Sequence, residues 1–513
     1  MRLLGAEAMR ELDRRATADQ GLDTQVLMEV AGASLAREAR ALRQVSGRRG
    51  PALLLVGGGN NGGDGLVCAR HLLAAGVSVH VLFWGDAERL SPESRRNLVL
   101  AERASVPLSR HPSLAQVVRL ADGAGVIVDC LFGTGFHGVP RAPLPDVIAA
   151  VNASPAPILS ADIPSGLSGD LGAGPEGACV RATRTLCMGA VKAGLFCAPG
   201  RAYAGEVRLE PLGIPEAAWH GLPVISGLEA ADIGPLLPPR RPAGHKGTYG
   251  TVLAVAGSLG MAGAAALCAG GALRAGCGLC QIACPDAIAT AVAIQRSEAT
   301  LRPVPTAPDG TIAESIVDRL PIWLAGVEVV VAGPGLGRGP GVRRAVLAIL
   351  EAFAGPIVLD ADALNAISLQ DLRRAHGAVV ITPHPGEAAR LLECASGEVQ
   401  ADRLSAVHRL AAGGQCVAVL KGAGTLIAAP DGQVSCNPTG NDGMATGGTG
   451  DVLAGVIAGL AAQGAEPGAA ATAGVYLHGL AGDLAAAAAS PRSLVAGDLL
   501  LQIGAAFRSL AEA

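Results

Sequence analysis

The chain has 513 residues, which is too long for one hydrophobic core and predicts roughly two to four domains. Hydrophobic residues make up 50% of it and aromatic residues only 2%, so Ala, Val, Leu and Ile are expected to fill the cores. The formal net charge is −4, and no cluster of Lys and Arg is interleaved with aromatic residues, which argues against nucleic acid as a partner.

The N-terminal segment MRLLGAEAMRELDRR carries charges throughout and has no uninterrupted apolar stretch. It is not expected to be a signal peptide, so a cytoplasmic protein without a membrane partner is predicted. Two helices follow in the prediction, over Ala6–Arg15 and Gln25–Arg43, the second with apolar residues at helical spacing.

Short apolar runs then alternate with helix-length amphipathic stretches, which predicts a parallel sheet covered by helices on both faces. The predicted strands of this first half are Ala52–Val56, Val77–Phe83, Val126–Cys130, Ile158–Asp162 and Thr185–Met188.

The segment VGGGNNGGDG, Val56 to Gly65, follows the first of these strands and precedes a helix-like stretch. Its glycines match G-x-G-x-x-G, the dinucleotide-binding fingerprint. However, it also carries Asn60, Asn61 and Asp64, and a carboxylate at a helix N-terminus would repel a pyrophosphate. The loop is therefore predicted to serve something other than an ordinary cofactor.

Further polar loops follow the later strands and offer oxygen ligands for a cation. Asn61, Asp129 and Ser165 provide amide, carboxylate and hydroxyl oxygens that suit a monovalent or hard divalent cation. Taken singly, Asp129 could only cap a helix or end a strand, and Ser165 could only be a turn residue.

Two other features complete this set of loops. Asp162 and Lys192 are titratable groups at strand ends, and Gly133–Val139 offers backbone N–H groups suited to a phosphate. In open α/β sheets, ligands bind at the carboxyl ends of the strands.

Between Ile214 and Arg241 proline becomes frequent and periodicity fades, which indicates a connection between domains. We place the boundary near Leu222, giving domains of residues 1–221 and 222–513. The second half resumes the α/β alternation, with strands predicted at Thr251–Ala256, Leu279–Ala283, Val327–Ala332, Ile357–Asp360, Ala378–Ile381 and Cys416–Leu420.

Two patterns in this half have structural explanations. Gly247–Leu273 lacks charge over the length of a membrane span, but a strand, a glycine loop and a buried helix explain it better. Cys277, Cys280 and Cys284 lack the second ligand pair of a zinc site and are predicted to be reduced and buried in a strand.

The motif GMATGGTGDVLAG, Gly443 to Gly455, predicts a phosphoryl-transfer site. Its glycines and the following helix N-terminus can hold a phosphoryl group, and Asp451 can take a proton from an attacking hydroxyl. The alternative is an aspartate that caps the helix. No Walker A pattern is present in the sequence, which argues against a P-loop kinase.

Other loops of the second half agree with a nucleotide site. LKGAGT places Lys421 and backbone N–H groups after a strand, AGPGLG permits close backbone approach, and TPHPGE holds His384 between two prolines. In LDADALN, the side chains of Asp360, Asp362 and Asn365 offer either Mg²⁺ coordination or helix capping.

With NNGGDGLVCAR, VDCLFGTG, DIPSGL and LMEVAGASLA, the first half resembles the NAD(P)H-hydrate epimerase family, which has a Rossmann-like fold. The resemblance implies a nicotinamide cofactor hydrated at C6 as substrate, Asp162 as acid/base, and K⁺ bound by Asn61, Asp129 and Ser165. The residues implied to contact the hydrate are Asn60, Asn61, Gly62, Gly63, Asp64, Gly133, Thr134, Gly135, Phe136, His137, Gly138, Val139 and Asp162.

With HKGTYG, GSLGMAGAAAL, GPGLG, TPHPGE, KGAGT and ATGGTGD, the second half resembles the ADP-dependent NAD(P)H-hydrate dehydratases, which have a ribokinase-like α/β sandwich. The resemblance implies ADP as co-substrate, Mg²⁺ as cofactor, Asp451 as the base and NADHX and NADPHX as substrates. It places Ala264, Gly335, His384 and Asp451 on the hydrate, and Lys421, Gly422, Ala423, Gly424, Thr425 and Gly450 on the nucleotide.

Together the two halves predict a bifunctional isomerase and lyase that repairs hydrated cofactors, expected to form a homo-oligomer. Three alternatives stay open at this point. One is a kinase of a small vitamin alcohol with a regulatory nucleotide domain, a second treats the first half as a binding scaffold, and a third is an NAD-dependent oxidoreductase that uses Asp86.

Overall fold

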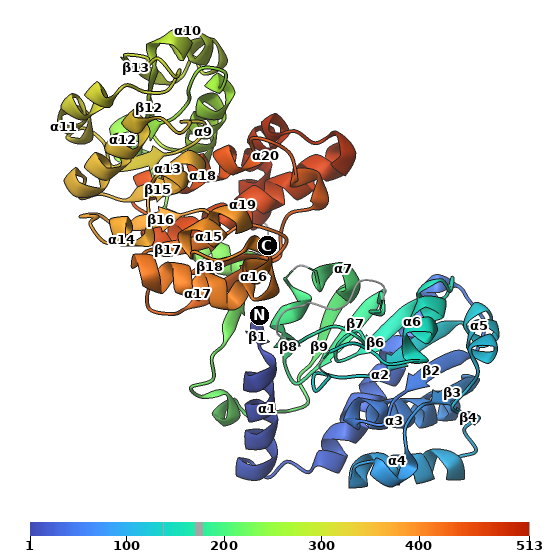
Figure 1. The fold of residues 1–513 in the computed structure, drawn as a ribbon. Helices are drawn as coiled ribbons and strands as arrows, with labels where there is room; N and C mark the ends of the chain where they lie inside the picture. Colours follow the sequence, from blue (N-terminus) through green and yellow to red (C-terminus); the bar gives the residue numbers. More distant parts are fainter. Residues whose placement is uncertain (137, 170–177, 198, 512–513) are drawn as a thin grey trace. The chain divides into compact units, whose positions relative to one another are not determined.

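The computed structural model describes residues 1–136, 138–169, 178–197 and 199–511. The chain divides into two compact units, Arg2–Ile225 and Ser226–Ala513, with Met1 assigned to the second (Figure 1). The division predicted from the sequence, between Gly221 and Leu222, falls in the same connecting segment. Each unit is described below by itself.

The described residues of the N-terminal unit form a seven-stranded parallel sheet in the order β4-β3-β2-β5-β6-β7-β9. The order reverses between β2 and β5, as in Rossmann-like folds, which confirms the predicted fold class. The strands are β2 (Ala52–Val56), β3 (Val79–Phe83), β4 (Leu108–Arg110), β5 (Val126–Cys130), β6 (Ile158–Ala161), β7 (Arg184–Met188) and β9 (Glu206–Glu210).

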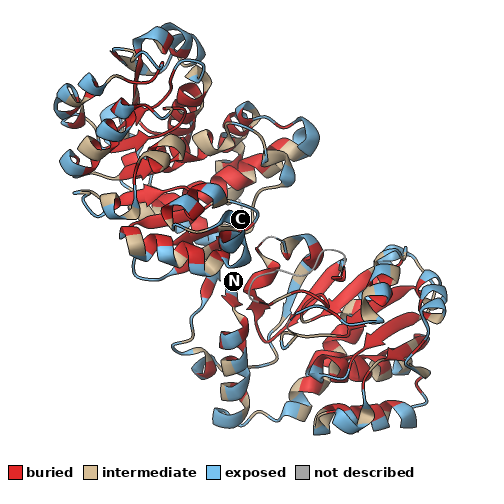
Figure 2. Cartoon of the chain, in the orientation of Figure 1, coloured by how far each residue is buried: buried red, intermediate tan, exposed pale blue. Residues whose placement is uncertain are grey.

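Helices cover both faces of this sheet because its strands are apolar on both sides. Leu54 and Val56 of β2 pack with α2, α3 and α4, whereas Leu53 and Leu55 pack with α5 and α6. Figure 2 shows the resulting pattern of buried strands beneath helices with exposed outer faces. The helices are α1 (Ala6–Arg14), α2 (Thr24–Ser46), α3 (Asn60–Ala74), α4 (Pro92–Arg103), α5 (Leu114–Asp122), α6 (Leu144–Asn152) and α7 (Arg201–Ala204).

A separate short pairing holds α1 in place. The parallel strands β1 (Arg2–Leu4) and β8 (Val191–Lys192) pair with each other, and α1 packs on residues near them. Leu4, Met9 and Leu12 are buried with Ala190 and Ala218. Because of this packing, one side of α1 lies at the carboxyl end of the seven-stranded sheet.

The glycine-rich segment after β2 is not the loop that we predicted. Helix α3 already begins at Asn60, with Gly59 as its N-cap, so Asn60–Gly63 form its first turn. Close packing explains the glycines in this turn, because a Cβ on Gly62 would lie 2.1 Å from the Gly57 carbonyl oxygen and one on Gly63 would lie 2.6 Å from Met28 Sδ. The predicted strand Ile158–Asp162 also ends one residue early, since Asp162 has a left-handed φ of +64°.

In the C-terminal unit the described strands follow the order β13-β12-β11-β14-β15-β16-β17-β18-β19-β10. They are parallel except where β18 pairs antiparallel with β17 and β19, and the order reverses between β11 and β14. The strands are β10 (Ile225–Gly227), β11 (Thr251–Val255), β12 (Leu279–Pro285), β13 (Thr300–Val304), β14 (Val329–Ala332), β15 (Ile357–Leu359), β16 (Val379–Ile381), β17 (Val417–Leu420), β18 (Thr425–Ala428) and β19 (Val434–Asn437).

Helices flank this sheet and complete the predicted ribokinase-like sandwich. They are α8 (Ala230–Ile233), α9 (Ala262–Ala275), α10 (Asp286–Gln295), α11 (Leu320–Leu324), α12 (Pro340–Ala352), α13 (Ala361–Ala366), α14 (Leu369–Leu372), α15 (Pro385–Leu391), α16 (Ser396–Ala401), α17 (Arg403–Gly414), α18 (Thr449–Ala462), α19 (Pro467–Ala488) and α20 (Ala496–Ala511).

Helices α9 and α18 pack unusually closely through small residues. A Cβ on Gly455 would lie only 1.9 Å from the Cys268 carbonyl oxygen, and one on Gly271 only 2.4 Å from that of Val452. The uncharged segment Gly247–Leu273 is therefore a strand, a loop and a buried helix, as predicted. No helix within the described ranges is long and apolar enough to cross a bilayer. Cys277, Cys280 and Cys284 are buried and free, which confirms that they are packing residues.

Candidate functional site

A cavity of about 730 Å³ lies at the carboxyl ends of β2 and β5, where the strand order of the N-terminal unit reverses. The rings of Phe132 and Phe136 stack in its wall with centroids 4.2 Å apart. Among the predicted hydrate residues, the cavity is lined by Asn60, Asn61, Asp64, Gly133, Thr134, Gly135, Phe136 and Asp162.

Four of the residues predicted to contact the hydrate do not line this cavity. Gly62 and Gly63 are buried within α3, and Gly138 and Val139 are exposed on the surface. His137 lies outside the described residues.

Asp162 is held beside a fully buried lysine. Its left-handed backbone conformation, rare for a residue with a Cβ, turns the chain at the end of β6. Lys192 Nζ donates hydrogen bonds to Asp162 Oδ1 and, at 2.9 Å each, to the Met188 and Ala190 carbonyl oxygens. Burial alone would lower the pKa of Lys192, but the Asp162 charge raises it, so the lysine stays protonated. Asp162 is thus a carboxylate fixed against a cation.

Two more carboxylates line the same cavity. Burial raises the pKa of Asp64 well above its ordinary value, and the Asp162 charge adds to the effect. Asp13 belongs to α1 and was not predicted. Although it is solvent-exposed, the cavity wall desolvates its carboxyl and raises its pKa to about 6. Met9 and Asp13 lie four residues apart on α1, and Thr17 lies four residues further on, in the π-helical turn Arg15–Asp19; this spacing was the signal available in the sequence.

Asn61, Asp129 and Ser165 are brought together as predicted. Asp129 is fully buried, and its Oδ1 accepts a hydrogen bond of 2.6 Å from Ser165 Oγ. Asn61 Nδ2 donates to the Phe132 carbonyl oxygen at 2.7 Å, while Asn61 Oδ1 is buried without a hydrogen-bond partner in the described structure. Ser165 Oγ also donates to the Phe132 carbonyl oxygen, so the three side chains share one neighbourhood, and an orphaned buried oxygen there fits a monovalent cation with oxygen ligands.

In the C-terminal unit, Asp451 lies in the first turn of α18, directly after the glycine loop. Burial is the main cause that raises its pKa to about 7. The negative charges of Asp360 and Asp362 raise this pKa further, whereas the positive charge of Lys421 lowers it. Lys421 Nζ instead pairs with Asp360 Oδ1 at 2.7 Å. Asp451 therefore has the protonation equilibrium expected of a general base at neutral pH.

The predicted phosphate-binding segments meet at this point. A Cβ on Gly450 would lie 3.3 Å from Lys421 Nζ, so the glycine loop lies directly against the lysine. Residues 421–424 form the turn between β17 and β18, and Thr425 begins β18. Arg403, which sequence reasoning missed, is buried beneath it and donates to the Leu420 and Gly424 carbonyl oxygens. It positions the turn from below.

The remaining predicted hydrate residues lie at the end of β14 and β16. Gly335 has a φ of +61°, and a Cβ on it would lie 2.7 Å from Ala264 Cβ, which shows that these two residues adjoin. His384 is the N-cap of α15, and its Nδ1 accepts a hydrogen bond from Gly386 N at 3.0 Å. Its Nε2 lies 3.4 Å from Glu387 Oε1, with more than half of the side chain exposed. His384 thus has a structural role and an accessible ring.

Two protein-family models match the chain. One is described as "YjeF-related protein N-terminus" and matches residues 24–194, and the other is described as "NAD(P)H-hydrate dehydratase" and matches residues 252–503. The bifunctional NAD(P)H-hydrate repair enzyme Nnr of Moorella thermoacetica is 42% identical over 100% of this chain and 98% of its own length. The chain belongs to this family of repair enzymes.

One further curated relative and one solved structure are also similar to the chain. The bifunctional NAD(P)H-hydrate repair enzyme Nnr of Escherichia coli is 39% identical and covers 87% of this chain and 83% of its own. The ADP/ATP-dependent NAD(P)H-hydrate dehydratase of Bacillus subtilis is 33% identical, with a TM-score of 0.49, over 56% of this chain and 99% of its own.

As a bifunctional NAD(P)H-hydrate repair enzyme, the protein carries an epimerase and a dehydratase domain on one chain. Family membership speaks against the vitamin-alcohol kinase, the binding scaffold and the NAD-dependent oxidoreductase that the sequence had left open.

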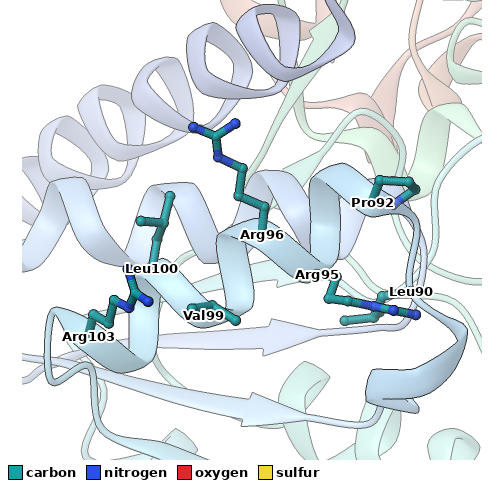
Figure 3. Close-up of a pocket in the computed structure, with 7 residues that line it drawn as sticks. All are labelled: Leu90, Pro92, Arg95, Arg96, Val99, Leu100 and Arg103. Carbon is teal, nitrogen blue, oxygen red and sulfur yellow. The ribbon is translucent and has the colours of Figure 1, made fainter.

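The repair enzyme has another hollow on α4, lined by Leu90, Pro92, Arg95, Arg96, Val99, Leu100 and Arg103. Figure 3 shows that Arg96 points away from Arg95 and Arg103, toward the opposite side of the helix. The three guanidinium groups therefore do not converge on one point, and this surface has the character of a solvated helix face.

Proposed function

We propose that the N-terminal unit interconverts the R and S epimers of NADHX and NADPHX, and that the C-terminal unit dehydrates the S epimer with ADP, releasing AMP and phosphate. The observation that carries the second step is Asp451, whose pKa is raised to about 7 beside the glycine loop and Lys421. An accessible base next to a cradle for phosphate is what transfer of a phosphoryl group to a hydroxyl requires.

In the dehydratase step, Asp451 takes the proton of the C6 hydroxyl, whose oxygen then attacks the terminal phosphorus of ADP. The bond from that phosphorus to the bridging oxygen breaks, and AMP leaves. Backbone N–H groups at the start of α18 and the Lys421 ammonium stabilise the charge on the transferred group.

The second half of this step restores the cofactor. The lone pair of the ring nitrogen expels the phosphate from C6, and loss of a proton from C5 re-forms the C5–C6 double bond. Phosphate is a far better leaving group than hydroxide, which explains why a nucleotide is needed. Mg²⁺ neutralises nucleotide phosphates when bound, and in proteins it is held by one or two carboxylates together with those phosphates. Asp362 is the candidate carboxylate because Asp360 is already paired with Lys421.

In the epimerase step, Asp162 is positioned by Lys192 to move a proton at the damaged ring. Asn61, Asp129 and Ser165 would hold K⁺, which supplies positive charge to the cavity when bound. The orphaned Asn61 Oδ1 supports this assignment.

The test is to add the protein to a purified mixture of both NADPHX epimers with Mg²⁺ and K⁺, and to follow the near-ultraviolet absorbance of reduced nicotinamide. We expect complete recovery that depends on ADP and is faster than spontaneous epimerisation. No recovery with ADP or with ATP would overturn the dehydratase assignment. Recovery that halts when the S epimer is consumed would overturn the epimerase assignment.

A further inference from the structure

A cationic hollow of about 340 Å³ lies beside the dehydratase loops, and the function proposed above uses only Asp362 of its lining. It is lined by Arg338, Gly339, Pro340, Arg343, Asp362, Asn365, Ala366 and Arg390. Three arginines thus face one aspartate, and that aspartate is already engaged, because Asp362 Oδ2 accepts a hydrogen bond of 2.8 Å from Gly337 N.

Arg343 and Arg390 are held in place mainly by main-chain oxygens. Arg343 donates to the Ala366 carbonyl oxygen at 2.5 Å and also lies 3.3 Å from Asp371 Oδ2. Arg390 donates to the Leu364 and Ile367 carbonyl oxygens at the end of α13. These bonds fix two guanidinium groups, and the printed hydrogen-bond acceptors of Arg390 are main-chain oxygens.

Arg338 adds an unbalanced charge. It is exposed, and within the described ranges no carboxylate pairs with it. Burial lowers the pKa of Arg390, the Glu387 charge opposes this, and the neighbouring Arg338 charge lowers the pKa again, so the two arginines lie close enough to repel each other. The N-terminus of α12, a helix of 13 residues capped by Gly339, adds partial positive charge to the same hollow. An anion bound here would relieve this repulsion.

The hollow adjoins the proposed dehydratase site through Asp362. Asp362 bonds Gly337, two residues from the Gly335 that contacts Ala264, and its charge contributes to the raised pKa of Asp451. The hollow is therefore contiguous with the loops proposed to bind the hydrate, with Asp362 between them.

We propose that Arg338, Arg343 and Arg390 form a subsite for the 2′-phosphate of NADPHX, so that the dehydratase prefers the hydrated form of NADPH over that of NADH. A phosphomonoester carries close to two negative charges, whereas each phosphorus of the pyrophosphate bridge carries one, and arginine is the residue that best matches the geometry of phosphate. This inference rests on the proposed dehydratase function.

The test compares Arg338→Gln with Arg344→Gln, measuring KM and kcat for purified S-NADPHX and S-NADHX at saturating ADP. Arg344 is the matched control because it lies on the same helix, α12, two residues after Val342. It pairs with Glu314 and does not line the hollow. We expect Arg338→Gln to raise the KM for NADPHX about ten-fold or more, as for loss of a hydrogen bond to a charged group, and to change the KM for NADHX less than about two-fold. The control should change neither.

Equal increases for both substrates would place the pyrophosphate here and overturn the proposal, as would an increased KM for ADP or no change at all. Calorimetric titration with adenosine 2′,5′-bisphosphate and with AMP gives a readout that needs no turnover. Arg338→Gln should weaken binding of the bisphosphate alone. If the unaltered protein binds the bisphosphate more tightly than AMP yet dehydrates neither hydrate, the proposed function fails while the phosphate subsite stands. Arg343→Gln provides a second variant, and an unchanged thermal unfolding midpoint establishes that each variant is folded.

Discussion

Both candidate catalytic aspartates lie near a lysine, fully buried Lys192 in one unit and partly buried Lys421 in the other, but the two pairings differ. Lys192 bonds Asp162 directly, whereas Lys421 bonds Asp360 and leaves Asp451 with a raised pKa. The same two residue types thus give a fixed carboxylate in one unit and a base poised near neutrality in the other.

The pH dependence of dehydration follows from Asp451. Because only the deprotonated carboxylate can accept the hydroxyl proton, kcat/KM should fall as pH decreases through about 7 and level off above it. Asp451→Asn should lower kcat by about 10² to 10⁴. Asp442→Asn, an aspartate outside the first turn of α18, is the control and should retain the rate and the pH profile. A wild-type rate that is independent of pH between about 5 and 9 would contradict a base with this pKa.

The cation site can be tested at Asn61. Replacing K⁺ by tetramethylammonium, which is too large for a buried site, should slow epimerisation by the protein but leave dehydration of the pure S epimer in place. Asn61→Leu should make the epimerisation rate low and insensitive to K⁺, because the orphaned oxygen is gone. Epimerisation that is equally fast without K⁺ would refute this ligand set.

At the scale of elements, apolar runs were predictable and glycine-rich ends were not. Strands β2 and β5 match the predicted ranges because five consecutive buried residues leave no alternative. Strands β18 and β19 were missed because their four-residue segments mix polar and apolar residues around a hairpin that only tertiary pairing stabilises. The start of α3 was missed because its glycines serve packing against Gly57 and Met28, which no local pattern shows.

The candidate site was predictable to a similar degree. The loops after β2, β5, β14 and β17 carry recognisable motifs, and the structure brings those of each unit together. Asp13 and Arg403 could not be found in this way, because each reaches its site from a helix that carries none of these motifs.

Two glycine-to-alanine substitutions should change the free energy of unfolding in opposite directions, one in the close contact of α9 and α18 and one in α19. Gly455→Ala should destabilise the protein by about 1 to 3 kcal/mol or more, because its Cβ would overlap the Cys268 carbonyl oxygen and force the helices apart. A Cβ on Gly468 in α19 would have no heavy atom within 4 Å, so Gly468→Ala should stabilise the protein by about 0.5 to 1 kcal/mol. Urea unfolding midpoints measure both, and a neutral Gly455→Ala would show that the helices can separate without cost.

At the scale of the whole molecule, the two sets of site residues belong to different compact units. A substitution in one site should therefore abolish the activity of that site and leave the activity of the other unchanged. Asp162→Asn should dehydrate pure S-NADPHX at the unaltered rate but consume the R epimer only as fast as it converts spontaneously. Asp451→Asn should still equilibrate the epimers, as followed by chromatography, while forming no NADPH. Slow dehydration of the pure S epimer by Asp162→Asn would show that the two sites are coupled.

The scarcity of aromatic residues also makes one of them a reporter. The sequence contains three tryptophans, and Trp84 lines the N-terminal cavity at the end of β3, beside the Phe132 and Phe136 wall. A dinucleotide entering that cavity should therefore change the emission of a protein whose fluorescence comes from few sources. Trp84→Phe should remove the change. Occupancy of the epimerase cavity would then be observable directly, in the full chain and without any turnover in the other unit.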